Sequence, residues 1–240
     1  MTISADLHIL WQLARGRRRG GTHQDQLESF YAGQADHYDR FRERLLHGRS
    51  ELLADLPLAP GERLVDLGGG TGRNVEFIGP RLAEMTAVDV VDLCGPLLEV
   101  ADRRAKAQGW TNVRTHRADA CTWQPALPAD VVLCSYSLTM IPDWRAALTN
   151  ALAMLRPGGR LAVVDFTIAA DAPALGRRRQ SWLARRGWQR WFAHDGVNLN
   201  HAHVEWLLAH TRCQSLVETS GPVPFLPGLR APYYRYIGVK

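Results

Sequence analysis

The chain has 240 residues, of which 46 % are hydrophobic and 22 % are charged, as in globular proteins that bury a full core. No run of about 18 apolar residues predicts a membrane span, and the four cysteines have neither metal-ligand spacing nor disulfide-framework density, so we expect a reduced, cytoplasmic, metal-free protein. The net charge of +5 favours an anionic partner without identifying it.

The first 49 residues precede the first predicted strand and have a helical pattern. Ile3, Leu7 and Trp11 fall on one face of a short helix, and the basic run "RGRRRGG" follows it. A secretory signal has its basic residues before its apolar part, so we expect none here. We predict a helical cap over 1–49 that packs on the sheet, packs on a partner subunit, or contacts a membrane as an amphipathic anchor.

Beyond the cap, short apolar runs alternate with longer amphipathic ones, which indicates a parallel sheet of βαβ units. Strands are predicted over 63–68, 84–90, 112–119, 129–137 and 160–166, followed by strand-like runs at 213–221 and 233–240. Helices are predicted over about 71–83, 95–108, 143–155 and 200–212. "RPGGRL" predicts a turn before the fifth strand. The predicted fold class is α/β, a Rossmann-like seven-stranded sheet, mostly parallel with an antiparallel last strand, in one domain over 50–240.

The glycine-rich stretch "VDLGGGTGRN" follows the first strand and begins a helix, where glycines let the backbone approach a ligand closely. The dinucleotide pattern G-x-G-x-x-G fails, because Arg73 occupies the place of the third glycine. The acid-x-Gly-x-Gly-x-Gly pattern resembles instead the first motif of class I S-adenosylmethionine-dependent methyltransferases. It consists of Asp66, Gly68, Gly70 and Gly72. A carboxylate suits the ammonium of the methionine tail, so we expect Asp66 to face it directly or through water.

Three later segments continue this resemblance at the ends of successive strands. Asp89 is placed to accept the ribose hydroxyls, and "RADA" resembles the adenine segment, in which Asp119 takes the exocyclic amine. "CSYSLTMIPDW" resembles the fourth motif and is expected to line the methyl-transfer site. The resemblance adds Tyr31 and Tyr38 of the cap as a lid over the cofactor, with ordinary helix–sheet packing as the alternative. The remaining cofactor positions that it implies are Val90, Ala120 and Ser135.

A narrower resemblance covers nearly the whole chain. "FYAGQADHYDRFRERLLHGRSELL", "VDVVDLCGPLLEVA", "CSYSLTMIPDWRAAL" and "FAHDGV" are similar to the diacylglyceryl-homoserine N-methyltransferases of betaine-lipid synthesis. This family implies three successive methylations of a homoserine amine that is ether-linked to diacylglycerol. It also implies a lipid substrate at an anionic membrane surface, a peripheral location on the inner face of the membrane, and a partner enzyme that supplies the lipid. A homo-oligomer stays open.

Methyl transfer requires a neutral amine held in line with the methyl group, whereas a free α-amino group titrates near pH ~8. The catalytic candidates are Tyr136, Tyr31 and His194, although a neighbouring sulfonium lowers the pKa of the amine and makes a dedicated base unnecessary. Aromatic faces tolerate the amine at every methylation stage. Substrate candidates are Tyr136, Met140, Trp191, Tyr233, and Arg235 for the carboxylate. Strand packing for Tyr233 and an exposed salt bridge for Arg235 are the alternatives.

The segment Arg177–Phe192 contains six arginines and three tryptophans and no acid. Tryptophan prefers the headgroup layer and arginine is attracted to anionic lipid, so we expect an insertion at about 173–199 to face substrate and membrane. The candidate lipid contacts are Arg177, Arg178, Arg179 and Trp191. Gly187 divides the segment, and we expect part of it in the core and part on the surface.

Two other functional classes remain open from the sequence. One is methylation of phosphatidylethanolamine or a small soluble amine, and the other is a noncatalytic adenosine-binding regulator that uses the basic segment on RNA. Nucleic-acid amino methyltransferases carry an Asn/Asp-Pro-Pro-aromatic loop after the fourth strand, where this chain has Ser135-Tyr136-Ser137-Leu138. That difference counts against a flipped base in the pocket, and we expect no stable nucleic-acid partner.

Overall fold

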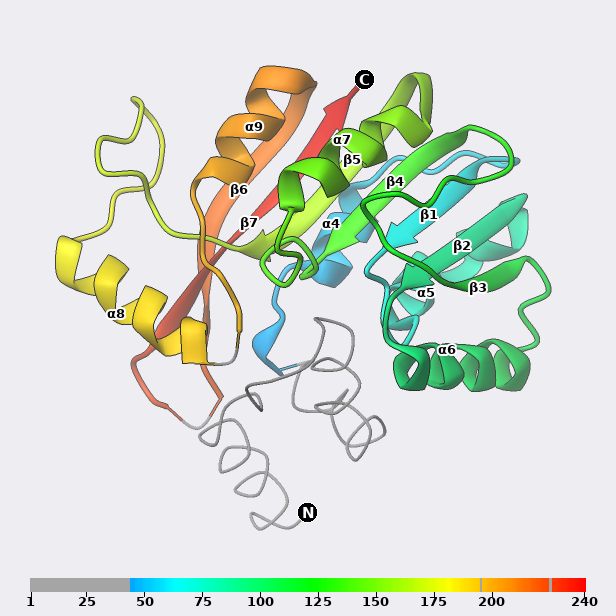
Figure 1. Ribbon diagram of the computed structural model, residues 1–240, viewed down its shortest axis with the longest axis horizontal. Coiled ribbons are helices and arrows are strands. Elements are labelled where there is room, and N and C mark those ends of the chain that lie inside the picture. Colours follow the sequence, from blue (N-terminus) through cyan, green and yellow to red (C-terminus); the bar gives the residue numbers. More distant parts are fainter. Residues whose placement is uncertain (1–43, 195, 225) are drawn as a thin grey trace, which may run out of the picture.

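The computed structural model describes residues 44–194, 196–224 and 226–240 (Figure 1). Its centre is a seven-stranded sheet of order β3-β2-β1-β4-β5-β7-β6. The strands are β1 (Arg63–Leu67), β2 (Ala87–Asp92), β3 (Val113–Arg117), β4 (Ala129–Ser135), β5 (Leu155–Phe166), β6 (Arg212–Pro222) and β7 (Arg230–Val239). Strands β1 to β5 pair in parallel, and β7 is antiparallel to both β5 and β6. The predicted fold class is confirmed.

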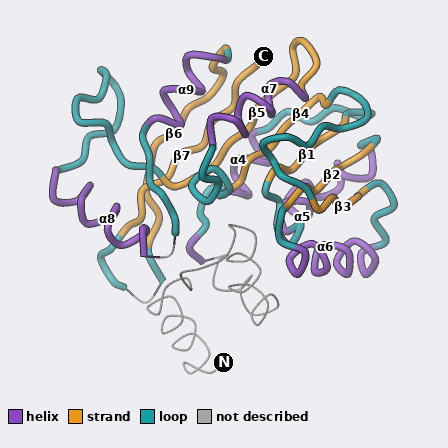
Figure 2. The backbone as a smooth tube through the Cα atoms, viewed as in Figure 1, coloured by secondary structure: helices purple, strands orange, loops and turns teal. Residues whose placement is uncertain are grey.

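Helices lie on both faces of this sheet (Figure 2). They are α4 (Arg49–Asp55), α5 (Arg73–Ile78), α6 (Gly95–Gln108), α7 (Trp144–Met154), α8 (Trp182–His194) and α9 (Ala202–His210), with a 3-10 helix at Gly79–Glu84. Helix α6 has the predicted bounds, because a proline in its first turn and the left-handed Gly109 at its end mark both termini. None of the helices among the described residues is long and apolar enough to cross a membrane.

The core has two halves because alternate residues of a strand point to opposite faces of the sheet. Val131 and Leu133 of β4 pack in the cluster that includes residues of α4 and α5. Val132 and Cys134 of the same strand pack in the cluster that includes residues of α7 and α9. The two clusters cover the two faces of the sheet. The carboxyl ends of the parallel strands all lie along one edge of the sheet, between these clusters.

Three predicted boundaries are wrong. "RPGGRL" lies within β5, which begins at Leu155 and has an irregular register opposite Ala129 and Val131. Strand β2 covers 87–92 rather than 84–90, because residue 84 ends the 3-10 helix. Gly187 does not divide its segment, since α8 continues through it. Most of the predicted cap, with Tyr31 and Tyr38, lies outside the described residues, and the division at residue 49 stays a prediction.

Candidate functional site

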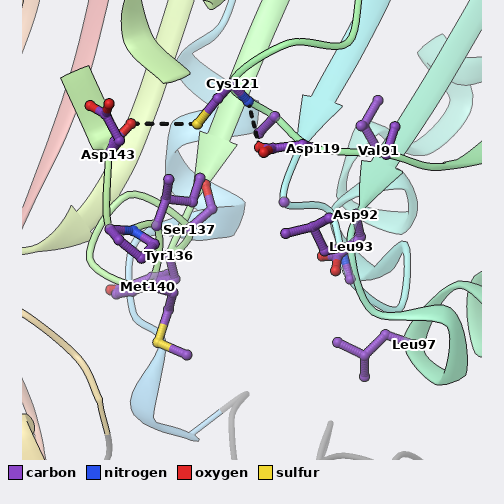
Figure 3. Close-up of a pocket in the computed structure, with 16 residues that line it drawn as sticks. Val91, Asp92, Leu93, Leu97, Asp119, Cys121, Tyr136, Ser137, Met140 and Asp143 are labelled. Atoms are coloured by element: carbon purple, nitrogen blue, oxygen red, sulfur yellow. Dashed lines mark hydrogen bonds between the residues drawn. The ribbon is translucent and has the colours of Figure 1, made fainter. Parts of the chain in front are cut away.

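A cleft of about 320 Å³ opens at the carboxyl ends of β1, β2 and β4. In Figure 3, Tyr136, Ser137 and Met140 lie on one side of it, and Asp92, Leu93 and Leu97 lie on the other. Its remaining lining residues come from the loops that follow β1, β3 and β4 and from Val91 of β2. They are Gly68, Gly70, Val91, Ala118, Asp119, Ala120, Cys121, Ile141, Pro142 and Asp143. This is the edge at which parallel α/β sheets bind ligands.

The glycine loop shapes one wall of the cleft. Gly68 has a φ of +71°, and a Cβ added there would lie 2.4 Å from the Cβ of Ser137. Gly70, with a φ of +55°, also lines the cleft. Gly72 instead precedes α5, and a Cβ there would lie 3.1 Å from Ala101 of α6. The absence of a side chain at Gly68 therefore lets Ser137 pack against the loop, and Gly72 serves the packing of α5 on α6, whereas a Cβ on Gly70 would meet only ordinary contacts with Leu97 and Asp92. The predicted contacts of these glycines with the cofactor stay predictions.

Asp66 lies beneath this loop rather than on the surface of the cleft. Its side chain is fully buried, and the amide of Asn74 donates to both carboxylate oxygens at 3.0 and 3.2 Å. Burial raises the pKa of Asp66 to about 7 against the opposing effect of the Asn74 hydrogen bond, and the charge of Asp92 raises it further. Asp66 thus supports the loop and is poised to change protonation near neutral pH.

The structure does not place Asp89, the predicted ribose contact, among the residues that line the cleft. Asp89 lies inside β2, opposite Val65 of β1, and its carboxylate lies 2.7 Å from Nε2 of His116. The acid at the end of β2 is Asp92, which lines the cleft. The observed strand starts three residues and ends two residues later than predicted, so that Asp92 and not Asp89 lies at its end. The run Val-Asp-Leu-Cys at 91–94 contained the signal for this acid.

Both carboxylate oxygens of Asp92 hold backbone amides. Oδ2 accepts a hydrogen bond from the Gly70 amide at 2.9 Å, and Oδ1 accepts one from the Cys94 amide at 2.8 Å. The side chain of Val90, the adjacent predicted cofactor position, is fully buried in the core and faces the loop at Gly69.

The segment after β3 forms the third side of the cleft. Asp119 and Ala120 both line it, and Oδ1 of Asp119 accepts the Cys121 amide at 2.8 Å. The Cys121 thiol donates to the carbonyl of Asp143 at 3.5 Å (Figure 3). Burial and the neighbouring Asp119 raise the pKa of this thiol to about 11. Cys121 is therefore a neutral wall of the cleft rather than a nucleophile.

Tyr136 forms the wall opposite Asp92, in a left-handed backbone conformation with a φ of +55°. Its hydroxyl donates to the backbone carbonyl of His47 at 2.7 Å, and its ring meets Phe166 edge-on at 4.6 Å. Burial raises the pKa of Tyr136 well above its ordinary value, so the phenol stays neutral and is ill suited to the predicted base or relay role. Ser135 is buried behind this wall, and Ser137 lines the cleft in its place.

The other predicted substrate residues divide between the cleft and distant contacts. Met140 lines the cleft. Arg235 forms a 2.7 Å ion pair with Asp55, and Tyr233 stacks on His47 at a centroid distance of 6.1 Å. Tyr233 thus takes part in packing and Arg235 in a salt bridge, which are the alternatives that the sequence left open for them, and their substrate roles stay predictions. Tyr31, Tyr38 and the side chain of His194 lie outside what the structure describes, and their roles stay predictions.

The arginines and tryptophans of the basic segment lie in different environments. Arg177 binds both carboxylate oxygens of Glu218 at 2.7 and 2.8 Å, so its charge is compensated within the protein, which argues against its predicted lipid contact. Arg178 donates its backbone amide to the same carboxylate at 3.1 Å. Arg179 and Trp191 remain exposed.

The chain resembles known proteins over most of its length. The methyltransferase domain family matches residues 37–214. Trans-aconitate 2-methyltransferase of Azoarcus sp. is 31 % identical over 151 residues, which cover 62 % of this chain and 57 % of that protein. A ubiquinone/menaquinone biosynthesis C-methyltransferase of Rhizobium leguminosarum is 30 % identical over 177 residues, covering 68 % and 66 %. The chain thus spans about half to two thirds of the length of these curated relatives.

The fold has a solved counterpart in the N-methyltransferase NodS of Bradyrhizobium japonicum, which was determined with S-adenosyl-L-homocysteine. The TM-score is 0.65 at 17 % identity, and the match covers 92 % of this chain and 99 % of that one. At this identity the likeness concerns the fold alone.

Proposed function

This chain belongs to the methyltransferase domain family, and we propose that it is an S-adenosylmethionine-dependent N-methyltransferase that trimethylates the homoserine amine of diacylglyceryl-homoserine. The cofactor assignment is supported by the cleft between Asp92 and Tyr136, which has the glycine loop at its edge. The acceptor rests on the resemblance of the four quoted segments to the betaine-lipid enzymes, and on an aromatic wall that suits an amine.

The residues around the cleft fit S-adenosylmethionine part by part. Gly68 and Gly70 line the cleft with backbone that carries no side chain, so a ligand can approach the chain closely there. Asp92 holds its carboxylate at the end of β2, where it suits the ribose hydroxyls. Asp119 and Ala120, on the loop after β3, suit the adenine, and the leucines at 93 and 97 supply apolar surface for its ring.

When bound, this cofactor supplies an electrophilic methyl group on a sulfonium, and the chain itself positions the acceptor. Tyr136 faces the cleft from the side opposite Asp92 (Figure 3). Its ring face attracts an ammonium at every stage of methylation by cation–π contact of about 0.5–2 kcal/mol. Its neutral hydroxyl is held by the His47 carbonyl. Tyr136 therefore orients the amine and attracts its positive charge, and it does not remove a proton.

A second candidate is methylation of a small carboxylate, which the similarity to trans-aconitate 2-methyltransferase favours. A carboxylate acceptor needs no deprotonation, because it is already ionised at neutral pH. The negative charge of such an acceptor would also be attracted to a protein with a net charge of +5.

The proposal is tested by incubating the purified protein with labelled S-adenosylmethionine and separate acceptors, followed by mass spectrometry. The acceptors are vesicles with diacylglyceryl-homoserine, vesicles with phosphatidylethanolamine, a soluble primary amine, and trans-aconitate. We expect products with one, two and three added methyl groups on the homoserine lipid, and transfer by an Asp92→Asn variant that is slower by roughly 10- to 100-fold at limiting cofactor. Transfer to trans-aconitate alone would establish the second candidate. Cofactor binding without transfer to any acceptor would favour a regulator.

A further inference from the structure

Helix α8 has an anchored side and an outward side. Phe192 is 4 % exposed, and its ring lies 4.5 Å from Phe166 at the end of β5. On the outward side, Trp182 is 61 % exposed, Leu183 is 73 % exposed and Trp191 is 44 % exposed. Figure 1 shows the helix at one end of the molecule, far from α6. Large apolar side chains on the outer surface of an isolated helix mark an interaction site.

This helix is connected to the acceptor wall of the cleft. Phe166 meets Phe192 on one side and Tyr136 on the other, at centroid distances of 4.5 and 4.6 Å. Beyond the helix, the Asn198 amide donates to the carbonyl of Thr139, in the loop after β4, at 2.8 Å. Whatever α8 binds is therefore held close to the side of the cleft where the acceptor enters.

The arginines of the segment fall into two groups. Arg177 is paired with Glu218, and Arg185 is paired with Asp171 at 2.5 Å. By contrast, Arg179, Arg186 and Arg190 are exposed. The last two lie at i+3 and i+7 from Leu183, on the outward side of the helix. The Arg186 guanidinium lies 5.5 Å from the centroid of the Trp182 ring. The outward face therefore presents positive charge and apolar side chains together.

We propose that the outward face of α8 docks on an anionic lipid bilayer and holds the acceptor side of the cleft at the membrane surface. We call this set the docking face: Trp182, Leu183, Arg186, Arg190 and Trp191, all of which lie on α8. The inference deepens the proposed function and rests on it for the nature of the acceptor. Of the lipid contacts predicted from the sequence, the docking face keeps Trp191 and omits the arginines at 177–179, which precede α8, and it adds Trp182, Leu183, Arg186 and Arg190.

The side chains of the docking face favour a bilayer over other partners. Tryptophan and leucine enter the boundary between headgroups and acyl chains, which accounts for the exposed Trp182 and Leu183. Exposed arginines attract anionic lipid phosphates. Nucleic acid would use the arginines but would leave Leu183 without a partner. A second copy of the chain would bring the same positive charges together.

The inference is tested by vesicle sedimentation with the full chain and vesicles that contain no methyl acceptor, either phosphatidylcholine alone or phosphatidylcholine with phosphatidylglycerol. The test variant is Arg186→Gln/Arg190→Gln. The control is Arg103→Gln/Arg114→Gln, which removes the same charge from exposed positions near the opposite edge of the sheet. We expect the test variant to lose roughly 30-fold in its partition onto anionic vesicles, and the control to change less than about threefold.

A third variant, Leu183→Ser, separates insertion from charge. We expect it to weaken binding to anionic vesicles although the net charge is unchanged. Equal partition of the parent and the charge variant would overturn the inference. So would concentration-dependent dimerisation that is lost in Leu183→Ser, or tighter binding of a short RNA than of anionic vesicles.

The same variants distinguish failure of docking from failure of the proposed function. All of them are expected to bind S-adenosylhomocysteine as the parent does, because no substituted side chain lines the cleft. Vesicle binding by the parent without methylation of any lipid would leave docking intact and refute the lipid acceptor. Methylation of vesicle-bound lipid at equal rates by the parent and the charge variant would refute docking and leave the function intact.

Discussion

The Asp92 carboxylate accepts the backbone N–H of Gly70 at 2.9 Å and thereby ties the end of β2 to the glycine loop after β1. Its other oxygen accepts the Cys94 amide, at the start of α6. A carboxylate oxygen has capacity for more than one hydrogen bond. Asp92 can therefore fix the loop and still accept hydroxyl groups of a ligand in the cleft, so one residue couples the shape of the site to binding.

Alanine variants of two glycines with left-handed backbones distinguish the effect of backbone strain from the effect of a steric collision. Gly68 and Gly61 have φ values of +71° and +82°, but a Cβ on Gly61 has no atom within 4 Å, whereas one on Gly68 would collide with Ser137. We expect Gly61→Ala to lower the free energy of unfolding by about 1 kcal/mol and to leave cofactor affinity intact. Gly68→Ala should cost more stability and abolish binding of S-adenosylhomocysteine. Urea unfolding and calorimetry measure both, and equal behaviour of the two variants would contradict the placement of the loop.

The buried Asp66 predicts proton release when the cofactor binds. Burial raises its pKa to about 7, and a positive ligand beside the loop favours the ionised carboxylate, which lowers that pKa. Binding should therefore release up to about half a proton per protein molecule from Asp66 at pH 7, and affinity should increase as the pH rises from about 6 to 8. Calorimetry in two buffers of different ionisation enthalpy measures the released protons. Asp66→Asn should remove this carboxylate's share of the release, and an identical release by parent and variant would rule out Asp66 as its source.

His203 predicts a loss of stability in acid. It is fully buried against Trp144, and desolvation, with the charges of Arg145 and His201, lowers its pKa to about 4. The unfolded state takes up a proton near pH ~6.5 that the folded state refuses until about pH 4. This residue therefore lowers the free energy of unfolding by about 3 kcal/mol as the pH falls through that window.

The matched variant for this prediction is His203→Phe, which keeps a ring beside Trp144. The buried acids Asp66 and Asp165, whose pKa values are raised to about 7 and about 6, change stability in the opposite direction over the same window. The measurement is therefore the difference between parent and variant in urea unfolding at pH 7 and pH 4.5. We expect that difference to shift in favour of the variant at the lower pH, and a constant difference would show that His203 is accessible to protons in the folded state.

Tyr136 offers a test of orientation against proton removal. Tyr136→Phe keeps the ring and removes only the hydrogen bond to the His47 carbonyl, so we expect the methylation rate to fall by a few-fold at most. Tyr136→Leu removes the aromatic face and should lower kcat/KM by about tenfold or more. Rates are compared at saturating cofactor, with melting temperatures as the control for folding. Complete loss of activity in Tyr136→Phe would instead assign the hydroxyl a direct role in proton transfer.

The fold could be predicted from local pattern, because the alternation of apolar runs and the punctuation by glycine and proline determine it. The bounds of α6 are an example, with Pro96 and Gly109 at its ends. Asp89 and Asp92 could not be separated in this way. Both lie in one apolar run, and only the pairing with β1 and the 3-10 helix before β2 determine which acid reaches the edge.

Side-chain contacts between residues far apart in the chain are the second feature that could not be predicted from the sequence. The run of arginines predicts a charged surface, but Arg177 is compensated by Glu218, 41 positions away on β6. Likewise the motif predicts an acid at Asp66, but its depth beneath the loop and its raised pKa depend on tertiary burial. Composition identifies the kind of residue at a site, and packing decides which residues are available to a ligand.

The most direct measurement is a calorimetric titration of S-adenosylhomocysteine into the parent protein, Asp92→Asn and Asp89→Asn. Asp92 lines the cleft and Asp89 is held by His116, so the two variants change the same functional group at two positions of one strand that are three residues apart. We expect the parent to bind, Asp92→Asn to bind roughly 10- to 100-fold more weakly through loss of charge-assisted hydrogen bonds, and Asp89→Asn to bind as the parent does. The absence of binding by the folded parent, or the reverse order of the two variants, would contradict the site described above.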